Sequence, residues 1–256
     1  MADLGDYDVA LVRADNPGPF TLSGTNTWLF GREPTWVIDP GPAIGAHVEA
    51  VLDEAERRGG IGGIALTHDH ADHAASVAAL RERAGAPPLA AMRPGLGTVT
   101  LADDEAFGPL RAVATPGHAP DHVAFVAGEV CFTGDAVLGE GSVFIAPDPG
   151  AMSGYLAGLQ RLRALPLALI CPGHGPPVAD PAGKLDEYVA HRLDRERRLL
   201  AALDRGLRSE DELLDAAWDD APAALRSAAA VTLRAHLDKL REEGRLPPGA
   251  GQPRIR

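Results

Sequence analysis

The stretch of sequence that decides the fold is Leu66-Thr67-His68-Asp69-His70-Ala71-Asp72-His73, which holds three histidines and two aspartates within six residues. It follows a short apolar run that predicts a β-strand and precedes a segment with the pattern of a helix. Side chains on a tight loop at the end of a strand can converge on one point. Because neutral imidazole and carboxylate groups suit zinc, the segment predicts a metal site.

Three more candidate ligands lie farther along the chain, each after an apolar run and a glycine. They are His118 in TPGH, Asp135 in FTGD and His174 in PGHG. A glycine and a polar residue after an apolar run place the polar side chain on a turn at the end of a strand. Together with the first cluster, these residues give five histidines and two aspartates, which are enough donors for two metal ions.

Composition and charge limit the classes of function. The 256 residues are 45% hydrophobic and 23% charged, so the chain can build a sizeable core. The net charge of −12 disfavours binding to nucleic acid or to an anionic membrane, because the protein's own field repels phosphate. All of the imbalance lies in residues 1–182, with 10 basic and 22 acidic residues, whereas residues 183–256 have 14 of each.

The two cysteines and the first residues of the chain indicate a reduced, cytoplasmic location. Cys131 and Cys171 are forty residues apart, so a disulfide framework is excluded, and Cys131 is expected in the core. The acidic start of the sequence has no pattern of a signal peptide. No apolar stretch reaches the ~18 residues that a membrane span requires, so no membrane partner is expected.

Short apolar runs alternate with helical patterns through the first two thirds of the chain, which predicts an α+β sandwich rather than a βαβ repeat. The expected strands are Val9–Val12, Thr27–Phe30, Thr35–Ile38, Ile64–Leu66, Ala112–Thr115, Val123–Val126, Val130–Phe132 and Leu167–Cys171. The expected helices are Ala43–Arg58, Ala74–Ala84 and Ser153–Ala164.

The proline- and glycine-rich segment Gly173–Gly183 marks a change of organisation, and we expect domains at residues 1–182 and 183–256. The second domain has a capping box at Ser209–Glu212 and an amphipathic helix over Ala229–Glu243. A small helical set of this kind is typical of a winged-helix module. Acidic residues balance the basic ones on the last helix, which favours docking or homo-oligomerisation over DNA binding.

In order along the chain, HDHADH, GH, GD and PGHG resemble the motifs of the metallo-β-lactamase superfamily of binuclear hydrolases. Further segments resemble the lactamase-beta-like hydrolases that carry a C-terminal winged-helix domain. These segments are Asn16–Gly31, Val37–Gly41, Thr115–His122 and His191–Glu196. The resemblance implies an αββα sandwich, with the metals at one edge between two sheets, followed by a small winged-helix-like domain.

Carried over by position, the resemblance implies two zinc ions per chain. Their ligands divide into His68, His70 and His118 for the first ion, Asp72, His73 and His174 for the second, and Asp135 as the bridge. Such a pair of ions lowers the pKa of a shared water and presents hydroxide to the substrate. Asp72, beside that water, would orient it and accept a proton, which makes it the expected catalytic residue.

Five further residues complete the list of candidates and their alternatives. Asp39 matches a superfamily aspartate that supports the ligand loop. His122 either contacts substrate or the metal ligands or packs locally, and His191 either reaches back to the first domain or lies in solvent. His47 and His236 fall on predicted helices and are expected at the surface.

Three functions remain open at this point. The first is hydrolysis of an acyl bond in a small molecule, either a thioester, an ester or a lactone. The second is cleavage of single-stranded RNA by the same metal-activated hydroxide, and the third is regulation through nucleic-acid binding by the winged helix. RNA would need a basic track toward the metals, and the sequence shows none, so the acyl substrate is favoured.

Overall fold

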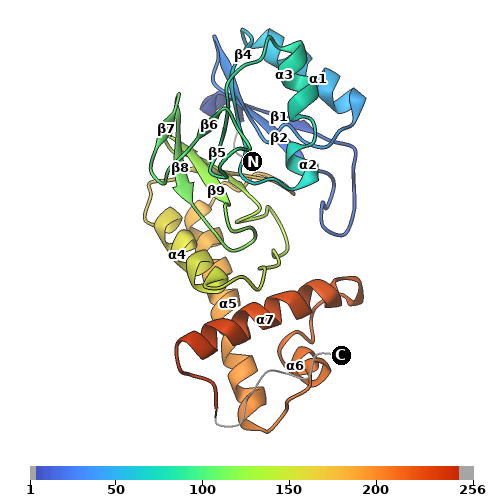
Figure 1. Cartoon of the computed structure of the whole chain (residues 1–256), viewed down its shortest axis with the longest axis vertical. Helices are drawn as coiled ribbons and strands as arrows, with labels where there is room; N and C mark the ends of the chain where they lie inside the picture. Colours follow the sequence, from blue (N-terminus) through green and yellow to red (C-terminus); the bar gives the residue numbers. More distant parts are fainter. Residues whose placement is uncertain (1–3, 248–256) are drawn as a thin grey trace.

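The computed structural model describes residues 4–247, which form a layered sandwich and a helical unit beyond one end of it (Figure 1). Two β-sheets face each other, one with six strands and one with five. Helices cover the outer face of each sheet, which gives the order helix, sheet, sheet, helix. The expected αββα sandwich is therefore confirmed.

The first sheet has the strand order β1-β2-β3-β4-β5-β6. Its strands are β1 (Val9–Arg13), β2 (Asn26–Phe30), β3 (Thr35–Ile38), β4 (Ile61–Ala65), β5 (Leu89–Ala91) and β6 (Val99–Thr100). The first three pair antiparallel, and β3 to β6 pair parallel. The helices α1 (Gly45–Arg57) and α3 (Val77–Arg83) pack their apolar faces on the outside of this sheet.

The second sheet has the strand order β11-β10-β9-β8-β7. Its strands are β7 (Ala106–Phe107), β8 (Leu110–Ala114), β9 (Val123–Ala127), β10 (Val130–Gly134) and β11 (Leu169–Pro172). All neighbours pair antiparallel except β10 and β11, which are parallel. The helix α4 (Ala151–Arg163) and the first half of α5 (Pro181–Asp204) cover its outer face.

The main core lies between the two sheets and is rich in aromatic side chains. Trp28 and Phe30 of the first sheet meet Phe132 of the second, with ring centroids 6.4 and 5.8 Å away from the Phe132 ring. Burying an aromatic side chain of this size contributes about 1.5–3 kcal/mol. Cys131 and Cys171 are both buried and free, and the burial of Cys131 agrees with the sequence-based prediction.

The strand topology brings the ends of several strands to one edge of the sandwich. Asp39 follows β3 and the loop that begins at His68 follows β4, and these two strands are parallel neighbours. On the facing sheet, Asp135 follows β10 and His174 follows β11, which are again parallel neighbours. Because carboxyl ends of parallel strands lie at the same edge, all these loops meet in one place.

The helical unit begins inside α5, a helix of 24 residues that crosses the predicted domain boundary without a break. The short helix α6 (Glu210–Ala217) starts with the expected capping box at Ser209, and η2 (Ala223–Leu225) and α7 (Arg226–Glu242) follow. These helices enclose a separate apolar cluster and correspond to the expected winged-helix domain. No strand follows β11 in the chain as far as residue 247.

The structure differs from the predicted elements at a few points. The expected helix over Ala74–Ala84 is divided into α2 (Ala71–Ala74) and α3, because the backbone N–H of Ser76 donates to Gly41 O rather than continuing the helical ladder. The short strands β5, β6 and β7 were not predicted. Among the helices of the described part of the chain, none is both long and apolar enough to cross a bilayer.

Two histidines expected at the surface are buried, so that prediction was wrong. His47 is 4% exposed, and its Nε2 lies 2.9 Å from Thr27 Oγ1 and 3.1 Å from Pro40 O. His236 is fully buried on α7 with its ring 5.8 Å from that of Trp218. Both lie on helix faces that dock against other elements, which the local pattern does not reveal.

Candidate metal centre

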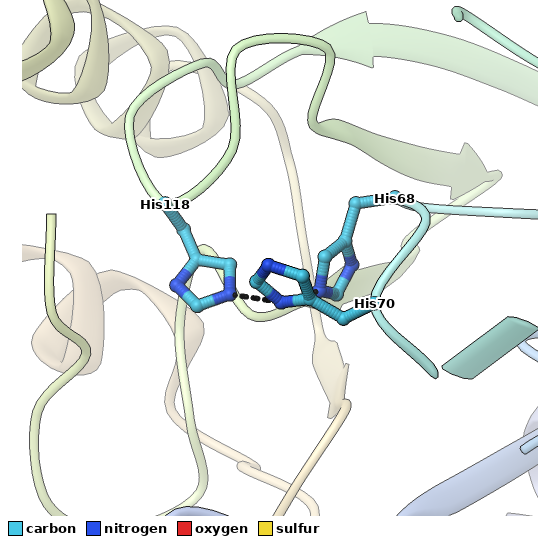
Figure 2. A group of neighbouring side chains, drawn as sticks. All are labelled: His68, His70 and His118. Carbon is cyan, nitrogen blue, oxygen red and sulfur yellow. Dashed lines mark hydrogen bonds between the residues drawn. The ribbon is translucent and has the colours of Figure 1, made fainter. Parts of the chain in front are cut away.

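Three histidines from two loops form the first half of the site. Figure 2 shows His68, His70 and His118 with their rings turned toward one another. His70 Nδ1 lies 3.0 Å from His68 Nε2 and 2.9 Å from His118 Nε2. His68 and His118 are 2% and 4% exposed, so their rings are shielded from bulk solvent, whereas His70 is partly exposed.

Two histidines and one aspartate form the second half, and a second aspartate lies between the halves. His174 Nε2 lies 3.3 Å from His73 Nε2 and 3.2 Å from Asp72 Oδ2. Asp135 stands between the two halves: its Oδ2 lies 3.5 Å from His118 Nε2, and its Oδ1 lies 3.5 and 3.4 Å from the two Nε2 atoms of the second half. The structure thus brings together all seven predicted ligands.

The spacing of these atoms fits bound metal ions. Donors about 2.1 Å from a tetrahedral ion lie about 3.4 Å from one another. The donor atoms of each group of three lie within 4.8 Å of one another, and the neighbouring pairs described above lie 2.9–3.5 Å apart. Asp135 Oδ1 is buried and has no hydrogen-bond partner in the described residues, which suits a metal ligand. This set of imidazole and carboxylate donors is therefore compatible with metal binding.

Asp39 forms hydrogen bonds to the loop and to one histidine of the second half of the site. Its carboxylate accepts hydrogen bonds from Thr67 N at 2.8 Å, from Thr67 Oγ1 at 2.7 Å and from His73 Nδ1 at 2.9 Å. The residue is buried and adopts a φ of 52°, which is uncommon outside glycine. Asp39 thus lies where it was expected, in contact with a candidate ligand.

The other ring nitrogens also have fixed partners. His68 Nδ1 lies 2.9 Å from Thr67 Oγ1, and His118 Nδ1 lies 3.2 Å from the carbonyl oxygen of Phe144. His174 Nδ1 lies 3.4 Å from Gly24 O. Partners of this kind set the tautomer and direct the opposite nitrogen into the site.

The electrostatics of the second half favour a bound cation. Burial would lower the pKa of His73, but the carboxylates of Asp135 and Asp39 outweigh it and raise the pKa well above its usual value. Burial would also lower the pKa of His174, but the carboxylates of Asp135 and Asp72 raise it to about 9. Burial would raise the pKa of Asp135, but His73 and His174 hold it well below its ordinary value. The carboxylate of Asp135 therefore stays ionised between these two imidazoles.

His122 supports the site from the side of the second sheet. It is 1% exposed, its Nδ1 lies 2.8 Å from Thr115 Oγ1, and its Nε2 accepts a hydrogen bond from Asp135 N at 3.1 Å. Burial, together with the charge of His118, lowers the pKa of His122 to about 3, so it is neutral and able to accept. His122 thus contacts both a nearby threonine and the backbone amide of a candidate ligand.

A cavity of about 500 Å³ lies between the site and the helical unit. Its floor consists of His70, Asp72, His118, Asp135 and His174, and His191 lines its far side. Apolar side chains form much of the wall, among them Phe20, Leu22, Phe144, Trp218, Leu225 and Ala228. His191 thus faces the cavity, with its Nε2 accepting from Arg195 Nε at 3.2 Å. The site opens into a space that both parts of the molecule enclose.

Several contributing residues escaped the sequence analysis. Thr25 Oγ1 donates to Asp72 Oδ2 at 3.3 Å, and Asn26 Nδ2 donates to Pro172 O and Gly175 O on either side of His174. Polar residues next to an apolar strand, in the segment SGTNTW, were a usable signal for these two. The contact with Phe144 is made by its backbone carbonyl, which every residue has, so the residue type does not predict it.

Replacing Asp39 with asparagine is expected to weaken metal binding by about 10- to 100-fold, the usual effect of removing a partner of a metal-bound imidazole. Asparagine tolerates a positive φ, so the change removes the charge while the backbone can keep its conformation. Chelator competition would measure the affinity. An affinity equal to that of the unaltered chain would contradict the support assigned to Asp39.

The comparison with protein families agrees with this geometry. Residues 20–96 and 93–174 match the model of the metallo-beta-lactamase superfamily, and residues 209–246 match that of the beta-lactamase associated winged helix domain. The chain therefore belongs to the metallo-β-lactamase superfamily.

Individual relatives support this membership. Lactamase-like protein adaB of Aspergillus niger is 37% identical over 209 residues, which cover 77% of this chain but only 64% of that protein. The beta-lactamase-like protein 2 homolog of Caenorhabditis elegans is 30% identical over 254 residues, covering 92% of this chain and 85% of the relative.

Solved structures show the same fold. The metallo-beta-lactamase family protein TTHA1429 from Thermus thermophilus has 25% identity and a TM-score of 0.69, covering 93% of this chain and 94% of that one. TTHA1623, solved in a di-iron-bound form, has 29% identity and a TM-score of 0.54, covering 68% and 96%.

Proposed function

We propose that the protein is a binuclear zinc hydrolase that cleaves an acyl bond, either a thioester, an ester or a lactone. The observation that carries the proposal is the cavity of about 500 Å³, which has the histidine and aspartate cluster as its floor and apolar side chains on much of its wall. An apolar pocket with a few convergent polar groups is typical of a small-molecule site. An acyl group would lie against the wall with its carbonyl at the floor.

Two metal ions are supported by the arrangement of the donors. The first group would be His68, His70 and His118, the second Asp72, His73 and His174, and Asp135 offers one oxygen to each. Imidazole and carboxylate suit zinc, but the di-iron form of TTHA1623 makes iron the alternative. Metal analysis of the purified protein should find about two ions per chain, and metal-free, active protein would contradict the proposal.

The chain's own residues would handle the proton and the orientation of the substrate. Bound metal ions supply a water of lowered pKa and polarise the carbonyl oxygen of the substrate. Asp72 lines the cavity and its side chain is 28% exposed, against 11% for Asp135, so Asp72 is the carboxylate placed to orient a water and accept its proton. The apolar wall would exclude bulk water from the acyl group.

Charge pairing argues against nucleic acid as the substrate or partner. Lys239 of α7 is buried and pairs with Glu196 and Glu243, at 2.7 and 2.9 Å. The three arginines of α7, Arg226, Arg234 and Arg241, pair with acidic neighbours as well. The basic side chains of α7 are thus engaged in ion pairs within the protein. Homo-oligomerisation through the helical unit and a cytoplasmic location stay predictions.

A side-by-side assay of aryl esters, acyl thioesters, lactones and single-stranded RNA tests the choice of substrate. We expect metal-dependent turnover of at least one acyl class and no cleavage of RNA, because apolar side chains form much of the cavity wall and Asp72 and Asp135 lie at its floor. Cleavage of RNA without acyl turnover would instead establish the endoribonuclease alternative.

A variant that narrows the cavity tests whether the acyl group binds there. Ala228→Phe adds a ring to the wall formed by α7, so kcat/KM for long or aromatic acyl groups should fall at least about tenfold while acetyl esters are spared. Ala224→Phe is the matched control, because Ala224 is exposed and does not line the cavity.

A further inference from the structure

The segment of residues 143–146 lies against the loop that carries His118. His118 Nδ1 donates to Phe144 O at 3.2 Å, and the two rings are 4.6 Å apart. A second bond joins the same two segments, since Ala146 N donates to Gly117 O at 3.1 Å. The carbonyl of Phe144 therefore sets the orientation in which His118 presents Nε2 to His70.

The helical unit holds this segment from its other side. Arg192 of α5 donates from Nη2 to Val143 O at 2.5 Å, and Ile145 N donates to Thr232 Oγ1 of α7 at 3.1 Å. The residues on either side of Phe144 are therefore tied to two helices, Val143 to α5 and Ile145 to α7. Thr232 is 2% exposed, and its hydroxyl donates to Ala228 O at 3.2 Å, so both of its hydrogen-bonding roles are used.

The contacts of Arg192 hold its side chain in one conformation. It is 2% exposed, and its guanidinium lies 5.4 Å from the centre of the Tyr155 ring. A buried group with a carbonyl acceptor on one side and an aromatic face on the other has little freedom to move. Together, Arg192 and Thr232 fix the path of the backbone around Phe144.

We propose that Thr232 and Arg192 are positioning residues for the candidate metal centre, acting on His118 through the backbone of Val143, Phe144 and Ile145. The imidazole of a metal-binding histidine is oriented by the partner of its other nitrogen. Here that partner is a carbonyl whose position depends on α5 and α7. The helical unit thereby becomes part of the metal centre. This inference rests on the proposed function, because it requires that His118 binds metal.

Removing one hydroxyl tests the proposal. Thr232→Val keeps the shape of the side chain but leaves Ile145 N without its acceptor, so metal binding should weaken about tenfold, the lower end of the effect of losing an outer partner. Thr232→Ser keeps the hydroxyl and should behave as the unaltered chain. Competition with a chromophoric chelator gives the affinity, and the visible spectrum of the cobalt-substituted protein reports the geometry of the ligands.

The matched control is Thr35→Val. Thr35 is equally buried, and its Oγ1 donates to Phe30 O at 3.1 Å in the first sheet, away from the segment of residues 143–146. It should lose some stability without a change in metal affinity or cobalt spectrum. If Thr232→Val and Thr35→Val have the same affinity and spectrum, the positioning role is wrong.

A second variant and a measurement on the metal-free chain keep the two proposals apart. Arg192→Met removes the donor to Val143 O but keeps an apolar stem over Tyr155, and should shift affinity in the same direction as Thr232→Val. In the metal-free protein, hydrogen exchange at the Ala146 amide should speed up in Thr232→Val but not in Thr35→Val. A chain that binds no metal would contradict the proposed function, whereas unchanged exchange at Ala146 would contradict the coupling alone.

Discussion

Replacing Asp135 with asparagine is expected to lower kcat by about a thousandfold, because one carboxylate faces both halves of the site. Its Oδ2 lies 3.5 Å from His118 Nε2 and its Oδ1 lies 3.4 Å from His174 Nε2. Loss of the negative charge between the two proposed metal ions should remove several kcal/mol of electrostatic stabilisation, and about 4 kcal/mol corresponds to that factor. Steady-state kinetics and metal content measured together would show the effect.

Asp69→Asn is the control for this change. Asp69 belongs to the same histidine-rich loop, but its carboxylate forms an ion pair with Arg93 at the surface. It should keep its metals and nearly all of its turnover. Should Asp135→Asn retain a tenth or more of the activity, the bridging role would have to be abandoned.

Asp72→Asn is expected to reduce kcat by a similar factor while leaving the fold intact. The pKa of Asp72 is subject to burial, which raises it, but His174 and His73 outweigh this and lower it. Asp72 is therefore a carboxylate at neutral pH, the form that accepts a proton. A positioned general base contributes about 10²- to 10⁴-fold, and a weakened contact with the second ion adds to the loss.

The measurements for Asp72 separate its two roles. Asparagine keeps the size of the side chain and an oxygen for the hydrogen bond from Thr25, which lies 3.3 Å away. If metal content stays near that of the unaltered chain while kcat falls, proton transfer is the larger contribution. A kcat within tenfold of the unaltered value would show that Asp72 is not the base.

The candidate ligands could be predicted because each is a histidine or an aspartate in a segment directly after a short apolar strand. His118, Asp135 and His174 all follow an apolar strand and a glycine, so local sequence alone predicts that each lies on a turn at the end of a strand. Parallel neighbours then bring those strand ends to one edge, which is a general rule of sheets. The seven residues therefore meet in the structure as the motifs imply.

Other features depend on contacts that local sequence does not contain. His47 and His236 lie on helices with mixed polar and apolar faces, and only the packing of α1 and α7 decides that these two side chains are inside. The strands β5 to β7 have two or three residues each, too short for an alternating pattern to appear. The carbonyl of Phe144 is a backbone group, so its role follows from the path of the chain.

The continuity of α5 has a consequence for how the molecule unfolds. Leu185 and Tyr188 near its start belong to the core beneath α4, whereas Leu199 and Leu203 near its end belong to the core of the helical unit. Loss of either core would leave half of α5 without its packing partners and would expose apolar surface of the other core. We therefore expect the sandwich and the helical unit to unfold in one cooperative transition, because they share this helix.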